Sequence, residues 1–318
     1  MTARPTTTWK NAILEHHPEL RLEGEIAITS VVDPEGEAAY WDIDYESILQ
    51  DPYRTVTAEN PFYMRAIADA YAQAAHAASD GPMVADLGCG DGRFTREFLE
   101  LGCPRIVALD ISPRNLLRLS QRIAAIPGAS DRVLLVEGDV AVPPLPKGHF
   151  DLVLAAGVLC VLKDRYHEGV RACRDLVRPG GYLLVFDPID FGSVMYALVR
   201  HHLQELRTVL AEGTKTVDIA DPNAHRVAVR SVREMVQAHE RAGLRICSVT
   251  GIPLFPSLLF GGVKQMIPPT ADDLRLMRDL NDALTERFPD LWRAACILSQ
   301  RPEAQAQRTH RDTGSPPS

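Results

Sequence analysis

Three closely spaced glycines give the strongest chemical signal in this 318-residue sequence. They lie in Asp86-Leu87-Gly88-Cys89-Gly90-Asp91-Gly92, where a short apolar run ends and a helical pattern begins. Glycines at such a turn let the backbone bend sharply and approach a ligand closely. A dinucleotide-binding G-x-G-x-x-G turn would need a glycine at Arg93, and the Asp86 carboxylate would repel a pyrophosphate. The turn therefore predicts a site for a cationic ligand.

Two further carboxylates follow the next two apolar runs. Asp110 comes directly after residues 106–109 and can accept hydrogen bonds from the vicinal hydroxyls of a ribose. Asp139 follows residues 133–136, where its carboxylate could accept from an adenine amino group while Val140 packs on the ring. Three acidic residues at three consecutive strand ends therefore predict an adenosine site.

Short apolar runs alternate with helical patterns along most of the chain, which is typical of a mostly parallel sheet covered on both faces. Ser112 and Pro113 suit the N-cap and first turn of a helix between two such runs. We therefore predict an α/β, Rossmann-like fold with a seven-stranded sheet, an N-terminal helical cap and an inserted helical lid. The predicted strands are residues 83–87, 106–109, 133–136, 152–156, 182–186, 244–249 and 294–298.

The domain organisation follows from where this alternation starts and breaks. Residues 1–80 contain no long β-branched run and are expected to form a helical cap. Residues 81–300 carry the alternating pattern, which breaks at a lid insertion of about residues 190–230. Residues 301–318 are polar and rich in Pro, Gly and Ser, as in a disordered tail.

Composition narrows the function class. The formal net charge of −8 provides no general positive field for nucleic acid. The six cysteines are scattered and form no zinc-ligand pattern, so no metal site is predicted. Residues 1–10 lack the apolar core of a secretory signal, and the longest apolar run, 152–162, is shorter than the roughly 20 residues that span a bilayer. We therefore expect a cytoplasmic protein with neither nucleic acid nor a membrane as partner.

Five blocks of sequence, found in order, resemble the class I S-adenosylmethionine-dependent methyltransferases, in particular the bacterial small-molecule enzymes. They are residues 84–92, 108–112, 137–140, 150–153 and 176–182. The resemblance implies S-adenosyl-L-methionine as the cofactor, with the glycine turn around the methionine part, Asp110 on the ribose and residues 155–157 beside the sulfonium. The cofactor-binding residues predicted in this way are Asp86, Gly88, Cys89, Gly90, Gly92, Asp110, Ile111, Asp139, Val140, Ala156 and Gly157.

The acceptor side is less marked in the sequence. Residues 155–158 read Ala-Ala-Gly-Val, without the N-P-P-Tyr-type tetrapeptide of methyltransferases that act on nucleobases or glutamine. Methyl transfer from a sulfonium depends mainly on alignment, so a general base is optional. If the acceptor is a hydroxyl, a carboxylate or histidine near the ligand edge could take its proton. The candidates are Asp187, Asp190, His201, His202 and His167, each of which could equally be a structural surface residue.

The predicted function is methylation of a medium-sized, partly apolar small molecule, with oxygen favoured over nitrogen or carbon as the acceptor atom. Aromatic residues of the cap and lid could line an apolar acceptor pocket or simply belong to the core. They are Tyr40, Trp41, Tyr45, Tyr53, Tyr63, Phe191, Tyr196, Phe255 and Phe260. Only five lysines accompany 29 arginines, a composition we associate with high-G+C bacteria and hence with natural-product biosynthesis.

Alternative functions fit the same cofactor motifs. An enzyme of the same fold could use the cofactor without methylating, to catalyse a cyclisation or elimination, and a non-catalytic ligand-binding protein would retain the same turn. The predicted partner is a small-molecule methyl acceptor. A homodimer and a monomer are both consistent with the sequence.

Overall fold

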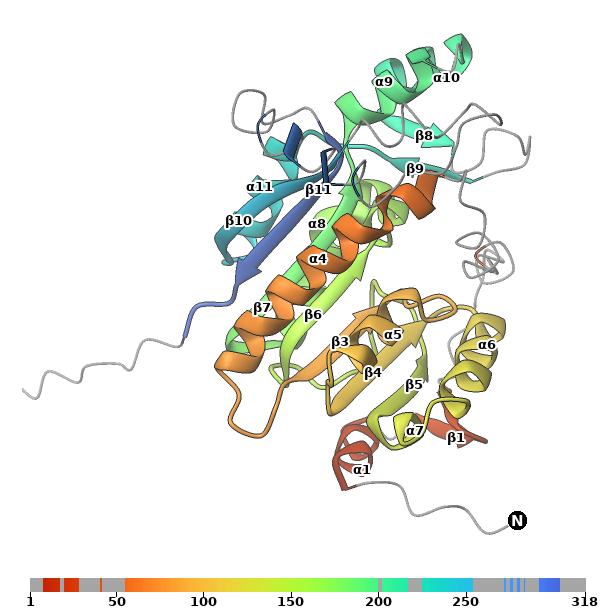
Figure 1. The fold of residues 1–318 in the computed structure, drawn as a ribbon, viewed down its shortest axis with the longest axis vertical. Coiled ribbons are helices and arrows are strands. Elements are labelled where there is room, and N and C mark those ends of the chain that lie inside the picture. Colours follow the sequence, from red (N-terminus) through yellow and green to blue (C-terminus); the bar gives the residue numbers. More distant parts are fainter. Residues whose placement is uncertain are drawn as a thin grey trace, which may run out of the picture.

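A mixed β-sheet forms the centre of the structure, a computed structural model (Figure 1). The described residues are 8–17, 20–28, 41, 55–199, 202–216, 225–253, 272, 275–276, 279–280, 283 and 292–303. Within them, nine strands pair in the order β1-β2-β5-β4-β3-β6-β7-β11-β10. The strands are β1 (Arg21–Glu23), β2 (Ile26–Ile28), β3 (Met83–Leu87), β4 (Arg105–Asp110), β5 (Val133–Glu137), β6 (Phe150–Ala156), β7 (Val177–Pro188), β10 (Arg245–Pro253) and β11 (Trp292–Gln300).

The strands from β2 to β7 are parallel, whereas β11 runs antiparallel to both of its neighbours and β1 antiparallel to β2. Strand order reverses at β3, because β4 and β5 continue on one side of it and β6 and β7 on the other. In open α/β sheets, ligands bind at such a switch point, outside the carboxyl ends of the strands. The topology therefore places a ligand crevice above β3 and β6.

Helices cover both faces of the sheet, as Figure 1 shows. Residues of α4, α5 and α6 form one buried core with alternate strand residues, among them Phe98 and Leu119. Residues of α1, α8 and α11 form a second core against the other face, with Tyr166 and Met235. The helices are α1 (Thr8–Glu15), α4 (Thr55–His76), α5 (Arg93–Glu100), α6 (Pro113–Ala124), α7 (Ala129–Arg132), α8 (Tyr166–Leu176), α9 (Asp190–Val199), α10 (Leu203–Glu212) and α11 (Val232–Arg241), with the 3-10 helix η1 (Leu159–Arg165) before α8.

Two helix starts follow the capping chemistry of their sequence. Ser112 accepts a hydrogen bond from the amide of Asn115 and caps α6, which opens with Pro113 as predicted. Ser231 and Glu234 form a capping box at the start of α11. Both helices therefore begin where their polar residues satisfy otherwise unpaired amides.

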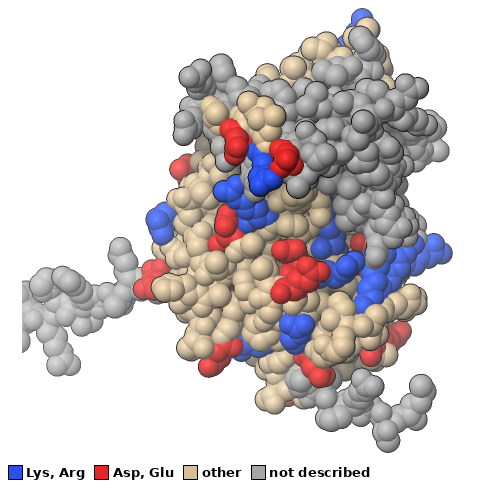
Figure 2. Space-filling model, viewed as in Figure 1, with Lys and Arg blue, Asp and Glu red and all other residues tan. Residues whose placement is uncertain are grey.

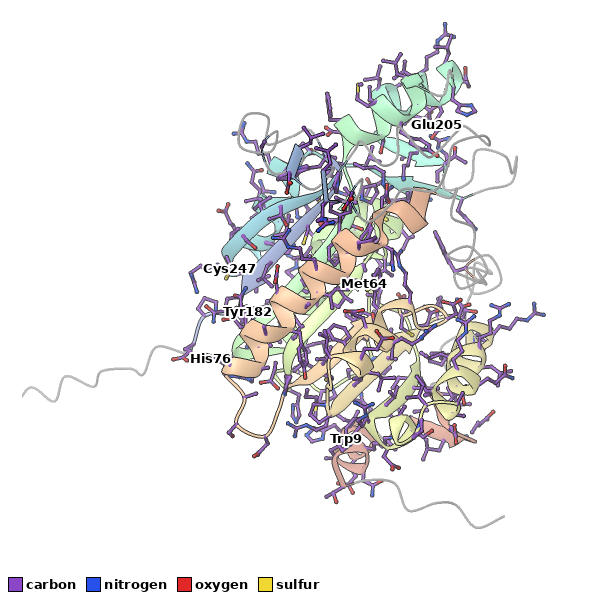
Figure 3. The ribbon with its side chains drawn as sticks, in the orientation of Figure 1. Trp9, Met64, His76, Tyr182, Glu205 and Cys247 are labelled. Atoms are coloured by element: carbon purple, nitrogen blue, oxygen red, sulfur yellow. The ribbon has the colours of Figure 1, made fainter. Side chains whose placement is uncertain are left out.

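The sheet is larger than the seven strands predicted. The first 80 residues contain β1 and β2 as well as helices, and β2 extends the sheet by pairing with β5 through Ile26 and Leu135. Ala27 is fully buried there. Three-residue strands are too short for hydrophobic alternation to be detected, and β2 is stabilised by pairing rather than by its own composition. In Figure 3, Trp9 on α1 lies at the end of the sheet opposite Glu205 on α10, so the N-terminal helices α1 and α4 do not form one continuous cap.

The insertion at 190–230 leaves the sheet after β7 and returns before α11. It contains the helices α9 and α10 and also a small antiparallel sheet of β8 (Thr214–Thr216) and β9 (Arg226–Ala228), which the sequence did not predict. Its two ends are joined, because Ile189 and Arg230 form a β-bridge and the Asp190 amide donates to the Arg230 carbonyl at 3.1 Å. The insertion therefore begins and ends at one point on the sheet.

The C-terminal tail is ordered further than predicted. Arg301, predicted to start the disordered tail, is ordered, because its amide and carbonyl both hydrogen-bond to the turn at residues 180–181. His201 lies outside the described residues, as do Tyr40, Tyr45, Tyr53, Phe255 and Phe260. No described helix combines the length and apolarity that a bilayer crossing requires. On the face seen in Figure 2, acidic and basic side chains are interspersed.

Candidate active site

The glycine turn after β3 adopts conformations that favour glycine. Gly88, Gly90 and Gly92 have φ values of 68°, 55° and 96°, in the left-handed region that side chains disfavour. A Cβ on Gly88 would lie 2.6 Å from Val158, and one on Gly92 would lie 2.2 Å from Leu119. The turn is therefore packed tightly against Val158 and Leu119, and side chains at Gly88 and Gly92 would not fit.

Asp110 at the end of β4 is tied to the backbone of this turn. Its carboxylate accepts from the Gly90 amide at 2.8 Å and from the Ser112 amide at 2.9 Å. Burial raises its pKa, and these two amides oppose the rise. The Asn115 side chain donates a third hydrogen bond, and a carboxylate offers about four acceptor positions. Asp110 is thus held in place with acceptor capacity to spare, as a ribose diol requires.

Asp86 has an unsatisfied oxygen beside the turn. One oxygen accepts from the Thr95 hydroxyl at 2.6 Å, while Oδ1 is buried without a hydrogen-bond partner among the described residues. Burial raises the pKa of Asp86 to about 7. A buried acceptor without a partner is costly, and a cationic donor would satisfy it and lower the pKa again. Asp86 therefore fits a ligand that carries an ammonium group.

The remaining predicted cofactor residues lie along the same edge. Asp139 is half-buried and accepts from the Ala141 amide at 2.8 Å, and Val140 beside it is buried. Ile111 is half-buried, as is Ala156 at the end of β6. Gly157 is exposed, has a φ of 69°, and would place a Cβ in open space. Cys89 is buried, and burial raises its pKa well above the usual range, so it is an inert packing residue.

Sequence reasoning missed one structural residue of the turn. Asp91 is 1% exposed and pairs at 2.7 Å with Arg122 of α6, whose guanidinium also donates to the Asp91 carbonyl. One guanidinium nitrogen of Arg122 thus contacts both the side chain and the backbone of Asp91 and holds the turn against α6. Nothing in the spacing of Asp91 and Arg122 predicts it, because the fold alone brings them together.

Asp187 is the catalytic candidate that lies nearest the predicted methyl donor. The Gly157 amide donates to the Phe186 carbonyl at 2.6 Å, so the end of β6 lies directly beside Asp187. Asp187 is 3% exposed, and one of its oxygens accepts from the Cys160 amide at 3.3 Å. The other oxygen, Oδ2, has no partner among the described residues, and burial raises the pKa of the carboxyl to about 7.

The structure does not bring the other candidates together with Asp187. Asp190 is exposed at the start of α9 and accepts from the amide of Phe191. His202 caps α10 on the far side of the insertion. His167 is exposed on α8, where burial and the charge of Arg241 on α11 lower its pKa. Of the described candidates, only Asp187 is buried at the ligand edge.

Charged residues that the sequence did not single out surround this part of the edge. Glu59 of α4 is fully buried and forms an ion pair with Arg293 of β11, which also donates to Tyr63 at 3.1 Å. Lys215 of β8 and Tyr166 of α8 complete the group. The charge of Lys215 opposes the rise that burial causes in the pKa of Asp187, and the charge of Asp187 adds to the rise that burial causes in the pKa of Tyr166. These residues come from four distant segments, so no local pattern could have revealed them.

The predicted aromatic pocket is only partly seen. Trp41 stacks on His225 with ring centroids 6.2 Å apart, and its carbonyl accepts from Asn115 near the start of α6. The N-terminal segment thus contacts both α6 and the insertion at this point. Tyr63 belongs to the buried core, whereas Phe191 is exposed on α9.

Comparison with known proteins agrees with this geometry. Residues 84–181 match the family model described as a methyltransferase domain. The chain is 34% identical over 111 residues to the ubiquinone/menaquinone biosynthesis C-methyltransferase of Pseudomonas paraeruginosa, over 34% of this chain and 42% of that protein. It is 30% identical over 107 residues to the 27-O-demethylrifamycin SV methyltransferase of Amycolatopsis mediterranei, over 34% of this chain and 39% of that protein. Each match thus spans less than half of the relative.

Among solved structures, geranyl diphosphate methyltransferase in complex with GPP and sinefungin superposes with a TM-score of 0.51 at 13% identity. The superposition covers 76% of this chain and 77% of that one, and supports the fold alone. The family match contains the glycine turn, Asp110, Asp139 and the end of β6. Residues 84–181 are therefore similar to a methyltransferase domain, and the resemblance to the class I S-adenosylmethionine-dependent methyltransferases implies S-adenosyl-L-methionine as the cofactor.

Proposed function

We propose that this chain transfers the methyl group of S-adenosylmethionine to a hydroxyl oxygen of a small molecule bound above β6 and β7. The observation that carries the proposal is the position of Asp187, a buried carboxylate with an unpartnered oxygen directly beside the end of β6. The insertion at 190–230 would act as the lid of this acceptor site, and residues 81–300 would form the catalytic unit.

The donor half of the site fits the cofactor. The unpartnered Asp86 oxygen would take the methionine ammonium, and Asp110 would take the ribose hydroxyls with its remaining lone pairs. Asp139 and Val140 would flank the adenine. Ala156 and Gly157 would lie beside the sulfonium, where the absence of a side chain on Gly157 leaves room for a reacting group.

The bound cofactor supplies a methyl carbon on a positively charged sulfur that leaves as a neutral thioether. The chain's own part is to align the acceptor and to manage its proton. Asp187 can accept a hydroxyl proton on Oδ2, since its raised pKa places it near the middle of its titration at neutral pH.

The relatives' names do not decide the acceptor atom, because one is a C-methyltransferase and the other acts on an O-demethylated substrate. The O-demethylrifamycin relative supports a role in bacterial natural-product biosynthesis. Oxygen is favoured here on the geometry of Asp187. The charges of Glu59, Arg293 and Lys215 also make the acceptor site more polar than the sequence suggested.

The test is calorimetric titration of the purified protein with S-adenosylhomocysteine and, separately, with NADH. We expect S-adenosylhomocysteine to bind and NADH not to bind. Asp110→Ala should weaken binding about 100-fold, since it removes charge-assisted hydrogen bonds to the ligand and to the turn. The exposed Asp190→Ala is the matched control and should bind as the wild type does.

Binding alone does not separate methyl transfer from the other uses of the cofactor. Incubation with methyl-labelled S-adenosylmethionine and a panel of hydroxylated small molecules should yield labelled methyl ethers and S-adenosylhomocysteine. Turnover of an acceptor without S-adenosylhomocysteine would instead identify the non-methylating alternative. Failure of the folded wild type to bind S-adenosylhomocysteine would overturn the proposal.

A further inference from the structure

The small sheet of the insertion directs one lysine toward the body of the protein. Thr214 and Thr216 of β8 share one face, where both hydroxyls accept from the Arg226 guanidinium at 3.0 Å. Because side chains alternate along a strand, Lys215 points to the opposite face. Its cross-strand neighbour Val227 is 3% exposed, and β9 packs against η1. Lys215 therefore lies half-buried on the face of this small sheet that packs against the body of the protein.

The charged groups around Lys215 are mostly engaged elsewhere. Glu59 is paired with Arg293, and Glu205 accepts from Thr216 and lies 3.7 Å from Arg226. Figure 3 shows Glu205 on α10 at this end of the molecule.

Two further neighbours of this group are held by the body of the protein. The Arg230 guanidinium lies 4.2 Å from the centre of the Tyr166 ring and donates to the Lys163 carbonyl. The Cys160 thiol donates to the Gly157 carbonyl at 3.3 Å. Arg230 is itself a cation, and burial raises the pKa of the Cys160 thiol so that it stays neutral, so neither group neutralises Lys215.

Among the described charged groups of this part of the edge, Asp187 and Lys215 do not form an ion pair with another residue. Asp187 Oδ2 is buried without a hydrogen-bond partner, and Lys215 forms no ion pair with the described carboxylates. The two groups are connected through η1, because β9, the partner strand of Lys215, packs against η1, and the Cys160 amide of η1 donates to Asp187. The charge of Lys215 also opposes the rise that burial causes in the pKa of Asp187. Burial and the neighbouring Arg293 lower the pKa of Lys215 to about 8, so the ammonium is still mostly protonated at neutral pH. An acceptor atom would thus meet a carboxylate from the sheet and an ammonium from the insertion.

We infer that Lys215 selects the acceptor: an acceptor hydroxyl binds between the Asp187 carboxylate and the Lys215 ammonium, which together exclude protonated amines. A hydroxyl oxygen can donate its proton to Asp187 and accept from Lys215 at the same time. A protonated amine offers only donors, so it would satisfy Asp187 but face the like charge of Lys215 in a site shielded from water. This inference rests on the proposed function and makes Lys215 a specificity-determining residue of the same site.

The experiment compares two probes of similar shape on the protein loaded with S-adenosylhomocysteine. The probes are 4-nitrophenol and 4-nitrobenzylamine, each titrated at neutral pH by calorimetry, with the visible absorbance of the phenolate as a second readout. We expect the wild type to prefer the phenol at least about ten-fold, the equivalent of one charge-assisted hydrogen bond. In Lys215→Met the preference should fall about ten-fold or reverse, because Asp187 then attracts the amine unopposed.

The control is Lys147→Met, which removes an exposed lysine paired with Asp175 far from the ligand edge and should leave the preference unchanged. Lys215→Gln, which keeps a polar group but not the charge, serves as a second variant if the methionine variant fails to fold. In the wild type, equal binding of both probes, binding of neither, or tighter binding of the amine would overturn the inference. An unchanged preference in a folded Lys215 variant would do the same.

These outcomes are separable from failure of the proposed function. Loss of S-adenosylhomocysteine binding by the wild type would overturn methyl transfer itself. Normal binding of S-adenosylhomocysteine with no effect of Lys215 would overturn only the selection of hydroxyl acceptors.

Discussion

The two halves of the ligand edge are built in different ways. On the cofactor half, above β3 to β5, Asp110 is held by main-chain amides two and twenty residues away, and glycines set the shape of the turn. On the acceptor half, above β6 and β7, side-chain ion pairs connect distant segments, such as Glu59 and Arg293, 234 residues apart. The contacts of the cofactor half thus join residues that are close in the sequence, whereas those of the acceptor half join distant segments and form only when the whole chain has folded.

The largest expected effect comes from breaking the acceptor half at Arg293→Met. The substitution removes the Arg293 guanidinium from the fully buried Glu59 carboxylate, and losing one side of a buried ion pair costs about 3–5 kcal/mol of unfolding free energy. Urea denaturation measures this loss. Arg165→Met, in an exposed pair with Glu168, is the control and should change stability little. If the variant remains folded, its S-adenosylhomocysteine affinity should be near normal, and a large loss would contradict the separation of the two halves.

The next effect is a pH dependence that arises at Asp86. Its folded-state pKa of about 7 lies above the unfolded value near 3.9, so its contribution to stability is present at low pH and is lost as pH rises from about 4 to 7. In Asp86→Asn this loss disappears. Without cofactor, the variant should match the wild type near pH 4 and exceed its stability by on the order of 3 kcal/mol above pH 7. Urea denaturation across this range is the measurement, and parallel curves would contradict the assignment.

A smaller effect is expected from Gly92→Ala in the cofactor half. The residue has a φ of 96° and its new Cβ would lie 2.2 Å from the Leu119 side chain, so we expect a loss of about 2 kcal/mol in stability. Because we propose that the turn holds the cofactor, S-adenosylhomocysteine affinity should fall as well. Gly102→Ala also has a positive φ, but its Cβ would meet nothing within 4 Å, so it separates backbone strain from the clash. Equal losses of affinity in both variants would show that the turn is not the binding element.

The smallest effects compare two helix caps. Ser112→Ala and Ser231→Ala should each cost about 1 kcal/mol of stability through the loss of an N-cap. Only Ser112 adjoins Asp110, whose carboxylate accepts from the Ser112 amide. Ser112→Ala should therefore weaken S-adenosylhomocysteine binding a few-fold and Ser231→Ala should leave it unchanged, as titration would reveal. Equal affinities in the two variants would argue against a coupling between the α6 cap and the cofactor half.

The same contrast explains what sequence reasoning could predict. Strand β3 and the glycine turn were located because a strand end, three glycines and a carboxylate lie within ten residues. The parallel arrangement of the central strands followed from the alternation of strands and helices. Strand β2 was missed because three residues carry no period, and its burial comes from pairing with β5.

The acceptor half could not be predicted because its residues have no common sequence neighbourhood. Lys215 lies in a three-residue strand of polar sequence, and its direction is set by pairing with β9. Tyr166 and Glu59 read as ordinary helix residues. Of the five catalytic candidates, Asp187 differed from the others only by the burial that the fold imposes on it.

The bridge between Ile189 and Arg230 has a consequence for how such enzymes diversify. A segment whose ends already meet can change its length or composition at little cost in loop-closure entropy, since that cost grows only slowly with length. Replacing the insertion would leave the sheet unchanged, because the elements on either side of it keep their connection through the bridge. Evolution could therefore substitute one insertion for another as a cassette, with a new acceptor each time and the same methyl donor beneath it.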